Sequence, residues 1–146
     1  MKPAPFAYKK ARSLDDAIAL LGEHKDARLL AGGQSLIATL NMRLSAPALL
    51  IDINGISGLD GISQNGRKVE IGALTRHAAA ERSDVIAKHA PLIAHAMPYI
   101  GHVAIRNRGT LGGSIAFADP AQAPLDVGSA QDGCEGATDG KTAAQR

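Results

Sequence analysis

The sequence predicts an α+β protein of two lobes followed by a tail. This prediction is based on three consecutive segments of the chain that differ in their residue pattern. Residues 1–55 alternate apolar, strand-like runs with helical runs and a glycine turn, which is typical of a βαβ unit. Residues 56–120 open with a hairpin signal and continue with helical segments, as expected of a second α+β lobe. Residues 121–146 have no apolar period and are expected to form a disordered or aberrant tail.

The first lobe is expected to contain a helix that follows Ser13. Ser13 has the side chain of an N-cap, Asp16 stands three residues later, and apolar residues continue at helical spacing to Leu21. Gly22 is expected to end this helix, because glycine is common just past a helix C-terminus.

The rest of the first lobe is expected to form two strands joined through a second helix. The apolar segment 28–31 predicts a short strand that ends at a glycine pair. A short helix is expected from Leu36 until shortly before Pro47, and the apolar run 49–53 predicts a buried strand. Strand, turn, helix and strand in this order predict parallel strands joined by a right-handed crossover.

The second lobe contains a turn signal, which is followed by short segments that are expected to be helices and a strand. Residues 64–67, Gln-Asn-Gly-Arg, predict the turn of a β-hairpin. Thr75 is expected to cap a helix, and residues 92–97 are expected to be helical up to the next proline. Residues 111–117 are expected to form a strand that follows the glycines before them.

Composition narrows the class of protein. The 146 residues are 45% hydrophobic and 21% charged, which is typical of a globular chain. The net charge of +2 and the aromatic content of 3%, without tryptophan, favour neither a nucleic-acid nor a membrane partner. The single cysteine, Cys134, excludes a disulfide framework and an iron–sulfur or Cys-rich zinc site made by this chain alone. No stretch reaches transmembrane length and residues 1–10 are not a signal peptide, so a cytoplasmic protein is expected.

The segment 29–40, LLAGGQSLIATL, places a glycine pair between an apolar run and a helical run. Backbone N–H groups can converge at such a turn without obstruction by a Cβ atom, and they can bind a phosphate group. Gln34 and Ser35 add side-chain donors. A tight strand-to-helix turn without a ligand is an equally good interpretation of this segment by itself. The sequence contains neither a G-x-G-x-x-G motif after the first strand nor a P-loop.

A second glycine pair lies in the segment 107–120, NRGTLGGSIAFADP. Hydroxyl groups flank the glycines, and Asp119 follows at a distance suited to accepting hydrogen bonds from ligand hydroxyls. Arg106 and Arg108 precede the glycines and would offset the charge of a diphosphate. The alternatives are that these arginines form a solvated surface and that Asp119-Pro120 is only a turn.

Three segments together give a specific resemblance: AGGQSLIATLNMRL (31–44), IGALTRHAAAE (71–81) and RNRGTLGGSIAFADP (106–120). In this order they resemble the FAD-binding, or medium, subunit of molybdenum hydroxylases of the carbon monoxide dehydrogenase and xanthine dehydrogenase type. The resemblance covers about residues 3–120. It implies a two-lobed FAD-binding fold of the vanillyl-alcohol-oxidase (PCMH) type, with FAD between the lobes.

The resemblance also implies which residues hold the cofactor. The first loop would cradle the diphosphate, the second would approach the flavin and the diphosphate, Asp119 would contact a ligand hydroxyl, and Thr75 would border the site. The implied cofactor-binding residues are Ala31, Gly32, Gly33, Gln34, Ser35, Leu36, Ile37, Thr75, Thr110, Gly112, Gly113, Ser114 and Asp119.

The implied chemistry is electron transfer, and no residue of this chain is expected to be catalytic or to bind a metal. A large partner subunit would oxidise the substrate at a molybdenum cofactor, and a small partner subunit would relay electrons through [2Fe-2S] clusters. FAD would pass the electrons to an acceptor such as NAD, a quinone or oxygen. Surface or packing roles are expected for the five histidines.

Three other interpretations remain open at this stage. The chain is a nucleotide-binding module without redox activity, a damaged fragment that binds nothing, or another flavoprotein of the same fold, such as a cell-wall precursor reductase. The segment 106–120 argues against the last of these.

The tail supports the second alternative. Leu125 and Val127 are its only large aliphatic residues, whereas the resembling family continues with apolar strands. A truncation of the chain, by a frameshift just after Pro120, is therefore expected, with an incomplete second lobe and weak retention of FAD.

Overall fold

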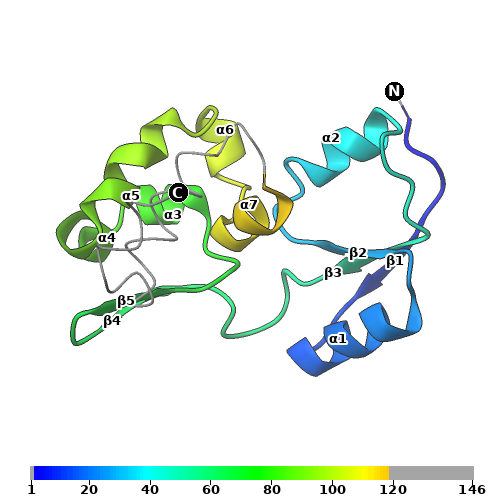
Figure 1. Ribbon diagram of the computed structural model, residues 1–146, viewed down its shortest axis with the longest axis horizontal. Helices are drawn as coiled ribbons and strands as arrows, with labels where there is room; N and C mark the ends of the chain where they lie inside the picture. The colour runs from blue at the N-terminus through cyan, green and yellow to red at the C-terminus, as the bar shows by residue number, and fades with distance from the viewer. Residues whose placement is uncertain (1, 119–146) are drawn as a thin grey trace, which may run out of the picture.

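The computed structural model describes residues 2–118, whose elements fall into a sheet lobe followed by a helical lobe (Figure 1). The sheet lobe contains β1 (Ala7–Lys10), α1 (Leu14–Glu23), β2 (Ala27–Leu30), α2 (Leu36–Asn41) and β3 (Leu49–Asp52). The helical lobe contains β4 (Ile62–Asn65), β5 (Lys68–Ile71), α3 (His77–Glu81), α4 (Asp84–His89), α5 (Pro91–Ala96), the 3₁₀ helix η1 (Met97–Tyr99), α6 (Val103–Arg106) and α7 (Leu111–Phe117).

The sheet of the first lobe is parallel and has the strand order β1-β3-β2. Strand β3 pairs with both neighbours, so that Leu49 lies opposite Ala7 on one side and Ala27 on the other. The parallel pair β2–β3, joined through α2, confirms the predicted βαβ unit. The sequence analysis missed β1, whose four residues are all exposed and show no apolar alternation.

Helix α1 begins at the predicted N-cap. Ser13 Oγ accepts a hydrogen bond from Asp16 N at 3.1 Å, and Asp16 Oδ2 accepts one from Arg12 N at 2.8 Å, so two N-terminal donors are satisfied. The predicted end at Gly22 is wrong, because the helix continues to Glu23 and its C-cap, His24, donates its N–H to Leu20 O at 3.1 Å.

The sheet lobe buries both faces of its central strand. Leu49 and Ile51 pack in one cluster with Ala17 and Leu20 of α1. Because side chains alternate along a strand, the fully buried Leu50 points to the opposite face, where α2 lies (Figure 1). Burial on both sides explains why β3 is a continuous apolar run in the sequence.

The hairpin of the helical lobe has the predicted position. Strands β4 and β5 are antiparallel, and Asn65 pairs with Lys68, which leaves Gly66 and Arg67 as a two-residue loop. Gly66 has a φ of 61° and Arg67 is not among the residues with positive φ, as in a type II′ turn.

The core of the helical lobe lies between the hairpin and the helices. Ile86, Ile93, Met97 and Ile100 are buried in one cluster with Leu111, and Ile62 and Ile71 of the hairpin pack against this cluster. The predicted helix at 92–97 corresponds to α5 and the start of η1, and the proline that follows lies within η1.

Two predictions for this lobe are wrong. Residues 111–117 form helix α7 and not a strand, because Thr110 Oγ1 accepts a hydrogen bond from Gly113 N at 3.2 Å and so caps a helical turn. Thr75 does not cap a helix. Its hydroxyl donates to Gly61 O at 2.9 Å and accepts from Gly61 N at 3.0 Å, and the N-cap of α3 is Arg76.

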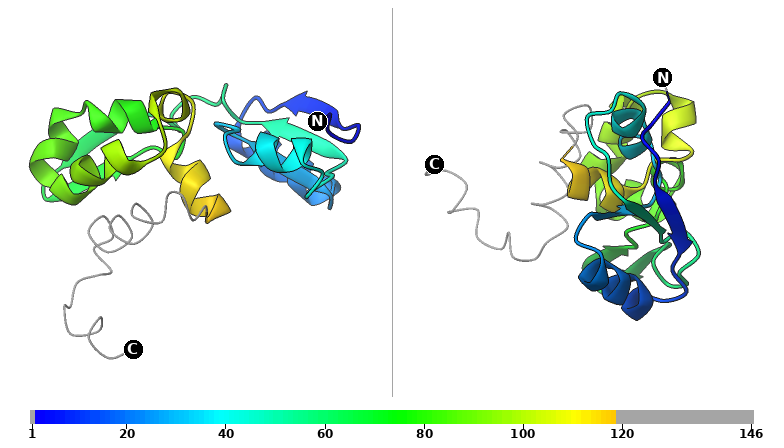
Figure 2. Two further views of the ribbon diagram at one scale, coloured as in Figure 1. Left: turned by 90° about the horizontal axis from the view of Figure 1, so that it is seen from above. Right: turned by 90° about the vertical axis from the view of Figure 1, so that its right-hand side faces the viewer.

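Helix α7 lies on the side of the helical lobe that faces the sheet lobe, as two views of the molecule agree (Figures 1 and 2). Within residues 2–118, none of the helices has both the length and the apolar character needed to span a membrane. The predictions for residues 119–146, including the tail and the frameshift, lie outside the described residues.

We expect Ile51→Ala to lower the free energy of unfolding by about 2–4 kcal/mol, because it leaves a cavity at a side chain that is 0% exposed. Urea titration followed by circular dichroism measures this change. The matched control is Ile18→Ala, since Ile18 is 58% exposed, and it should change the free energy by less than about 1 kcal/mol. Equal losses for both variants would contradict the assigned core.

Candidate functional site

Both glycine loops line one cavity of about 670 Å³ at the junction of the two lobes. The cavity contains most of the residues that the sequence analysis selected. These are Ala31, Gly32, Gly33, Gln34, Ser35 and Leu36 from the first loop, and Thr110, Gly112, Gly113 and Ser114 from the second. The expectation that the two loops contribute to one site is therefore supported by their position.

The two loops touch through their backbones. A Cβ atom built on Gly32 would lie 2.9 Å from Gly109 Cα and still closer to the carbonyl oxygen of Arg108. Real Cβ atoms do not approach a backbone this closely, so only glycine fits at position 32 without moving one of the loops.

The first loop presents backbone donors at the cavity. Within residues 2–118, the N–H groups of Gly32, Gly33 and Gln34 take part in no hydrogen bond. Gly33 has a φ of 71°, a conformation that L-residues rarely adopt, and it turns the chain from β2 into α2. Backbone N–H groups at a glycine turn that opens a helix can bind anionic groups such as phosphates.

The second loop was expected to offer hydrogen-bond donors to a ligand, but its backbone N–H groups bind other parts of the protein. Leu111 N donates to Thr75 O at 3.0 Å, Gly112 N donates to Ala73 O at 2.9 Å, and Gly113 N is bound by Thr110. A Cβ atom on Gly112 would lie 2.7 Å from Ala73 O. The glycines here allow close packing of α7 against the segment before α3, and their N–H groups are already used.

A buried histidine connects α3 to α7. His77 is 0% exposed, and its Nε2 lies 2.9 Å from Ser114 Oγ, which itself donates to Thr110 O at 3.0 Å. Which of the two groups donates in the contact between His77 and Ser114 is set by the tautomer of the imidazole. Burial lowers the pKa of His77; a hydrogen bond with the Thr110 backbone opposes this shift, and the nearby charge of Arg106 adds to it.

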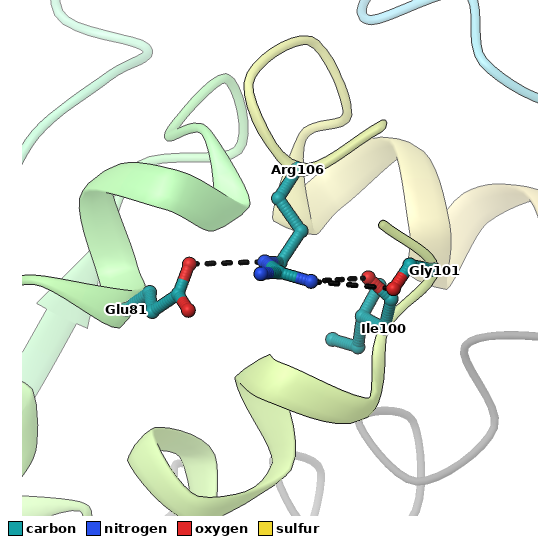
Figure 3. Close-up of polar contacts among 4 residues, drawn as sticks. All are labelled: Glu81, Ile100, Gly101 and Arg106. Carbon is teal, nitrogen blue, oxygen red and sulfur yellow. Dashed lines mark hydrogen bonds and ion pairs between the residues drawn. The ribbon is translucent and has the colours of Figure 1, made fainter. Parts of the chain in front are cut away.

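Arg106 does not offset the charge of a ligand, contrary to its prediction. Its side chain is buried in the helical lobe, where Nε donates to Glu81 Oε2 at 3.0 Å and Nη1 donates to the carbonyl oxygens of Ile100 and Gly101 at 3.3 and 3.2 Å (Figure 3). Arg106 therefore stabilises the turn between η1 and α6. Arg108 is exposed and is not among the residues lining the cavity.

Two of the predicted residues that the structure describes, Ile37 and Thr75, do not line the cavity. Ile37 packs beneath the loop, since its Cγ1 lies 3.2 Å from the position of a Cβ on Gly33. Thr75 binds Gly61 and lines a separate hollow of the junction. Asp119 lies outside the described residues.

The sequence analysis missed Arg28, which is the only charged side chain among the described residues that line the cavity. The available signal was a single charge inside an otherwise apolar strand, β2. Apolar side chains, among them Leu29, Leu44, Ile53 and Phe117, form much of the remaining wall.

A cavity between two lobes that is lined by a glycine turn, one cation and an apolar wall is suited to a ligand with both an anionic and an apolar part. The chain belongs to the family described as the FAD binding domain in molybdopterin dehydrogenase, whose model matches residues 4–129. The cofactor of this family is FAD, which agrees with the prediction from the three segments.

Similar proteins of known name agree with this family. The chain is 48% identical over 122 residues to the 6-hydroxypseudooxynicotine dehydrogenase complex subunit alpha of Paenarthrobacter nicotinovorans, covering 83% of this chain and 41% of that protein. It is 43% identical to the caffeine dehydrogenase subunit beta of a Pseudomonas species, with the same coverage. A solved structure of carbon monoxide dehydrogenase from Hydrogenophaga pseudoflava matches with a TM-score of 0.80 and 44% identity, covering 82% of this chain and 42% of that chain.

The chain thus spans about two fifths of the length of these relatives. Within residues 2–118, no group of three or more His, Cys, Asp or Glu side chains is arranged to hold a metal ion. That this chain binds no metal remains a prediction.

We expect Gly32→Ala to raise the dissociation constant of FAD at least about tenfold, because the new methyl group would force the two loops apart. Fluorescence titration of FAD measures this change. The control is Gly22→Ala, where an added Cβ would meet no atom within 4 Å, and FAD affinity should not change. Wild-type affinity in Gly32→Ala would contradict the contact between the loops.

We expect the pH dependence of stability to contain a contribution from His77. The pKa of His77 is lowered in the folded protein, whereas an unfolded chain binds the proton near pH 6.5. The contribution to stability is therefore present above about pH 6.5 and is lost as the pH falls toward the folded pKa. His77→Gln keeps a donor for Ser114 without a titrating ring. Thermal unfolding between about pH 8 and pH 5 should show a smaller pH dependence in this variant than in the wild type.

Proposed function

We propose that this chain provides the FAD-binding part of a cytoplasmic, molybdenum-containing hydroxylase or dehydrogenase. FAD would receive electrons from [2Fe-2S] clusters on a small partner subunit and pass them to an acceptor. The substrate would be oxidised at the molybdenum cofactor of a large partner subunit. The observation that supports this proposal most directly is that both glycine loops line one cavity, at which the N–H groups of the first loop have no partner within residues 2–118. The names of the relatives as dehydrogenase subunits support the reaction class.

We further propose that the sheet lobe and the helical lobe are the two lobes of the PCMH-type fold, with their boundary near residue 55. Two separate hydrophobic clusters, one in each lobe, support this division. The cavity at the junction would then hold the cofactor between the lobes.

The residues present fit an FAD molecule. The N–H groups of Gly32, Gly33 and Gln34 would bind the diphosphate, and Arg28 would offset its charge. Leu29, Leu44 and other apolar side chains of the wall would cover the apolar surface of a ring and exclude water. Bound FAD supplies the ability to accept and release electrons, which no side chain of this chain provides.

The second loop would position the cofactor by forming a closely packed wall of the cavity and would offer it few hydrogen bonds. Thr110 and Ser114 are buried and bound within the protein, and Gly112 and Gly113 bring α7 close to its neighbours. These residues would set the position of the wall opposite the first loop. Residues 110–114 would therefore tolerate few changes in volume, although they offer few free donors.

The test is a titration of the purified 146-residue chain with FAD, followed by absorption spectroscopy and by chemical reduction of the bound flavin. We expect bound, reducible flavin, and we expect co-expressed molybdenum and iron–sulfur subunits to reduce it when their substrate is added. ADP serves as the comparison ligand.

Each other outcome identifies a competing interpretation. Binding of ADP as tight as that of FAD, without reduction of bound flavin by the partner subunits, would favour a nucleotide-binding module without redox activity. Binding of neither ligand would favour a fragment without function. Either result would contradict the proposed electron transfer.

A further inference from the structure

Asn54 lies two residues after β3 and holds the end of β2 through its side chain. Its Nδ2 donates to Ala31 O at 2.8 Å and to Leu30 O at 3.2 Å, so the amide binds the backbone at which the first glycine loop begins. Asp52 fixes the orientation of this amide, because Asp52 Oδ1 accepts from Asn54 Nδ2 at 2.7 Å and from Asn54 N at 2.9 Å.

The remaining polar atom of the Asn54 amide reaches the other lobe. Asn54 Oδ1 accepts a hydrogen bond from Arg76 Nη2 at 2.9 Å. Arg76 Nη1 donates at the same time to the carbonyl oxygen of Arg108, which lies directly before the second glycine motif. The two arms of one guanidinium group therefore bind a side chain of the sheet lobe and the backbone of the helical lobe.

The backbone of Arg76 is itself joined to the second motif. Arg76 and Thr110 form an antiparallel bridge, with His77 N donating to Gly109 O at 3.1 Å and Leu111 N donating to Thr75 O at 3.0 Å. The backbone of Arg76 is therefore bound to the second loop, and its side chain binds Asn54, which in turn binds the start of the first loop.

We propose that Asn54 and Arg76 are a positioning pair that sets the spacing of the two glycine loops and thereby the affinity for FAD. This inference rests on the proposed function, because it assumes that the cavity between the loops holds FAD. The pair joins Ala31 to Arg108, and these residues flank the contact between Gly32 and Gly109. The pair adds a directional polar link to the packing contact between the two loops.

The chemistry of both side chains is specific for this role. The Asn54 amide donates to Ala31 O from Nδ2 and accepts from Arg76 at Oδ1, whereas an aspartate at position 54 would lose the donor. A lysine at position 76 carries one point charge and cannot present two divergent donors in a plane. Asp52 remains charged in this arrangement. Although partial burial raises its pKa, hydrogen bonds from Tyr8 and Asn54 hold the pKa below its usual value.

The test is a double-mutant cycle on the full 146-residue chain, with the dissociation constant of FAD measured by fluorescence titration. We expect Asn54→Ala and Arg76→Ala each to raise this constant by about tenfold. The double variant should also show about a tenfold increase, because each single change already breaks the same link. Independent roles would multiply to about a hundredfold, and that result would overturn the pairing.

Conservative and control variants separate positioning from general destabilisation. Asn54→Asp and Arg76→Lys should each weaken FAD binding, although thermal unfolding of the FAD-free protein should remain close to that of the wild type. Arg82→Ala removes the same charge from the end of the same helix, where no hydrogen bond among the described residues joins it to either loop, and it should leave FAD affinity unchanged. Wild-type affinity in Asn54→Asp and Arg76→Lys would overturn the proposal.

The outcome for the wild-type chain distinguishes the two levels of inference. Wild-type binding of FAD together with unchanged affinity in all Asn54 and Arg76 variants would overturn the positioning role and leave the proposed function intact. Failure of the wild-type chain to bind FAD would overturn the proposed function, and the positioning role with it.

Discussion

The absence of a side chain at Gly32 is the constraint on which the arrangement of the site depends. Here the backbone of the first loop meets the backbone of Arg108 and Gly109, and an added carbon atom would lie within 3 Å of both residues. This contact brings two segments that are far apart in the sequence to the wall of one cavity. Helix α7 and the hydrogen bond between Asn54 and Arg76 lie next to the same close approach. Because close-packed backbones cannot compress, the contact sets a lower limit to the loop spacing.

The two glycine motifs look alike in the sequence but have different roles in the structure. In the part of the chain that the structure describes, the N–H groups of Gly32 and Gly33 in the first motif have no hydrogen-bond partner. The N–H groups of the second motif are bound by the segment 73–75 and by the Thr110 hydroxyl. Pairing of this kind avoids the free-energy cost of a buried N–H group without a partner. Glycine is needed in the second motif for close packing, whereas in the first it allows both a turn and a contact.

Burial also decides what each arginine can do. Arg106 is only 8% exposed, and its guanidinium is bound by Glu81 and by two backbone carbonyls, so its charge is compensated within the helical lobe. Arg28 lines the cavity, and its Nη1 donates to Ala27 O at 3.0 Å. Arg76 bridges the two lobes. Three residues of one type thus stabilise a turn, line a cavity and join two loops.

The sequence by itself determined the features that depend on near neighbours. Ser13 and Asp16 marked the start of α1, Gly66 marked the hairpin, the run at 49–52 marked a buried strand, and three short segments identified the family. Only the tertiary structure decided that Thr75 binds Gly61 and that the N–H groups of residues 111 and 112 bind the segment 73–75. The physical reason is that a cap or a turn is satisfied within about four residues. The hydrogen-bond partner of a buried group, by contrast, is supplied by whichever distant segment packs against it.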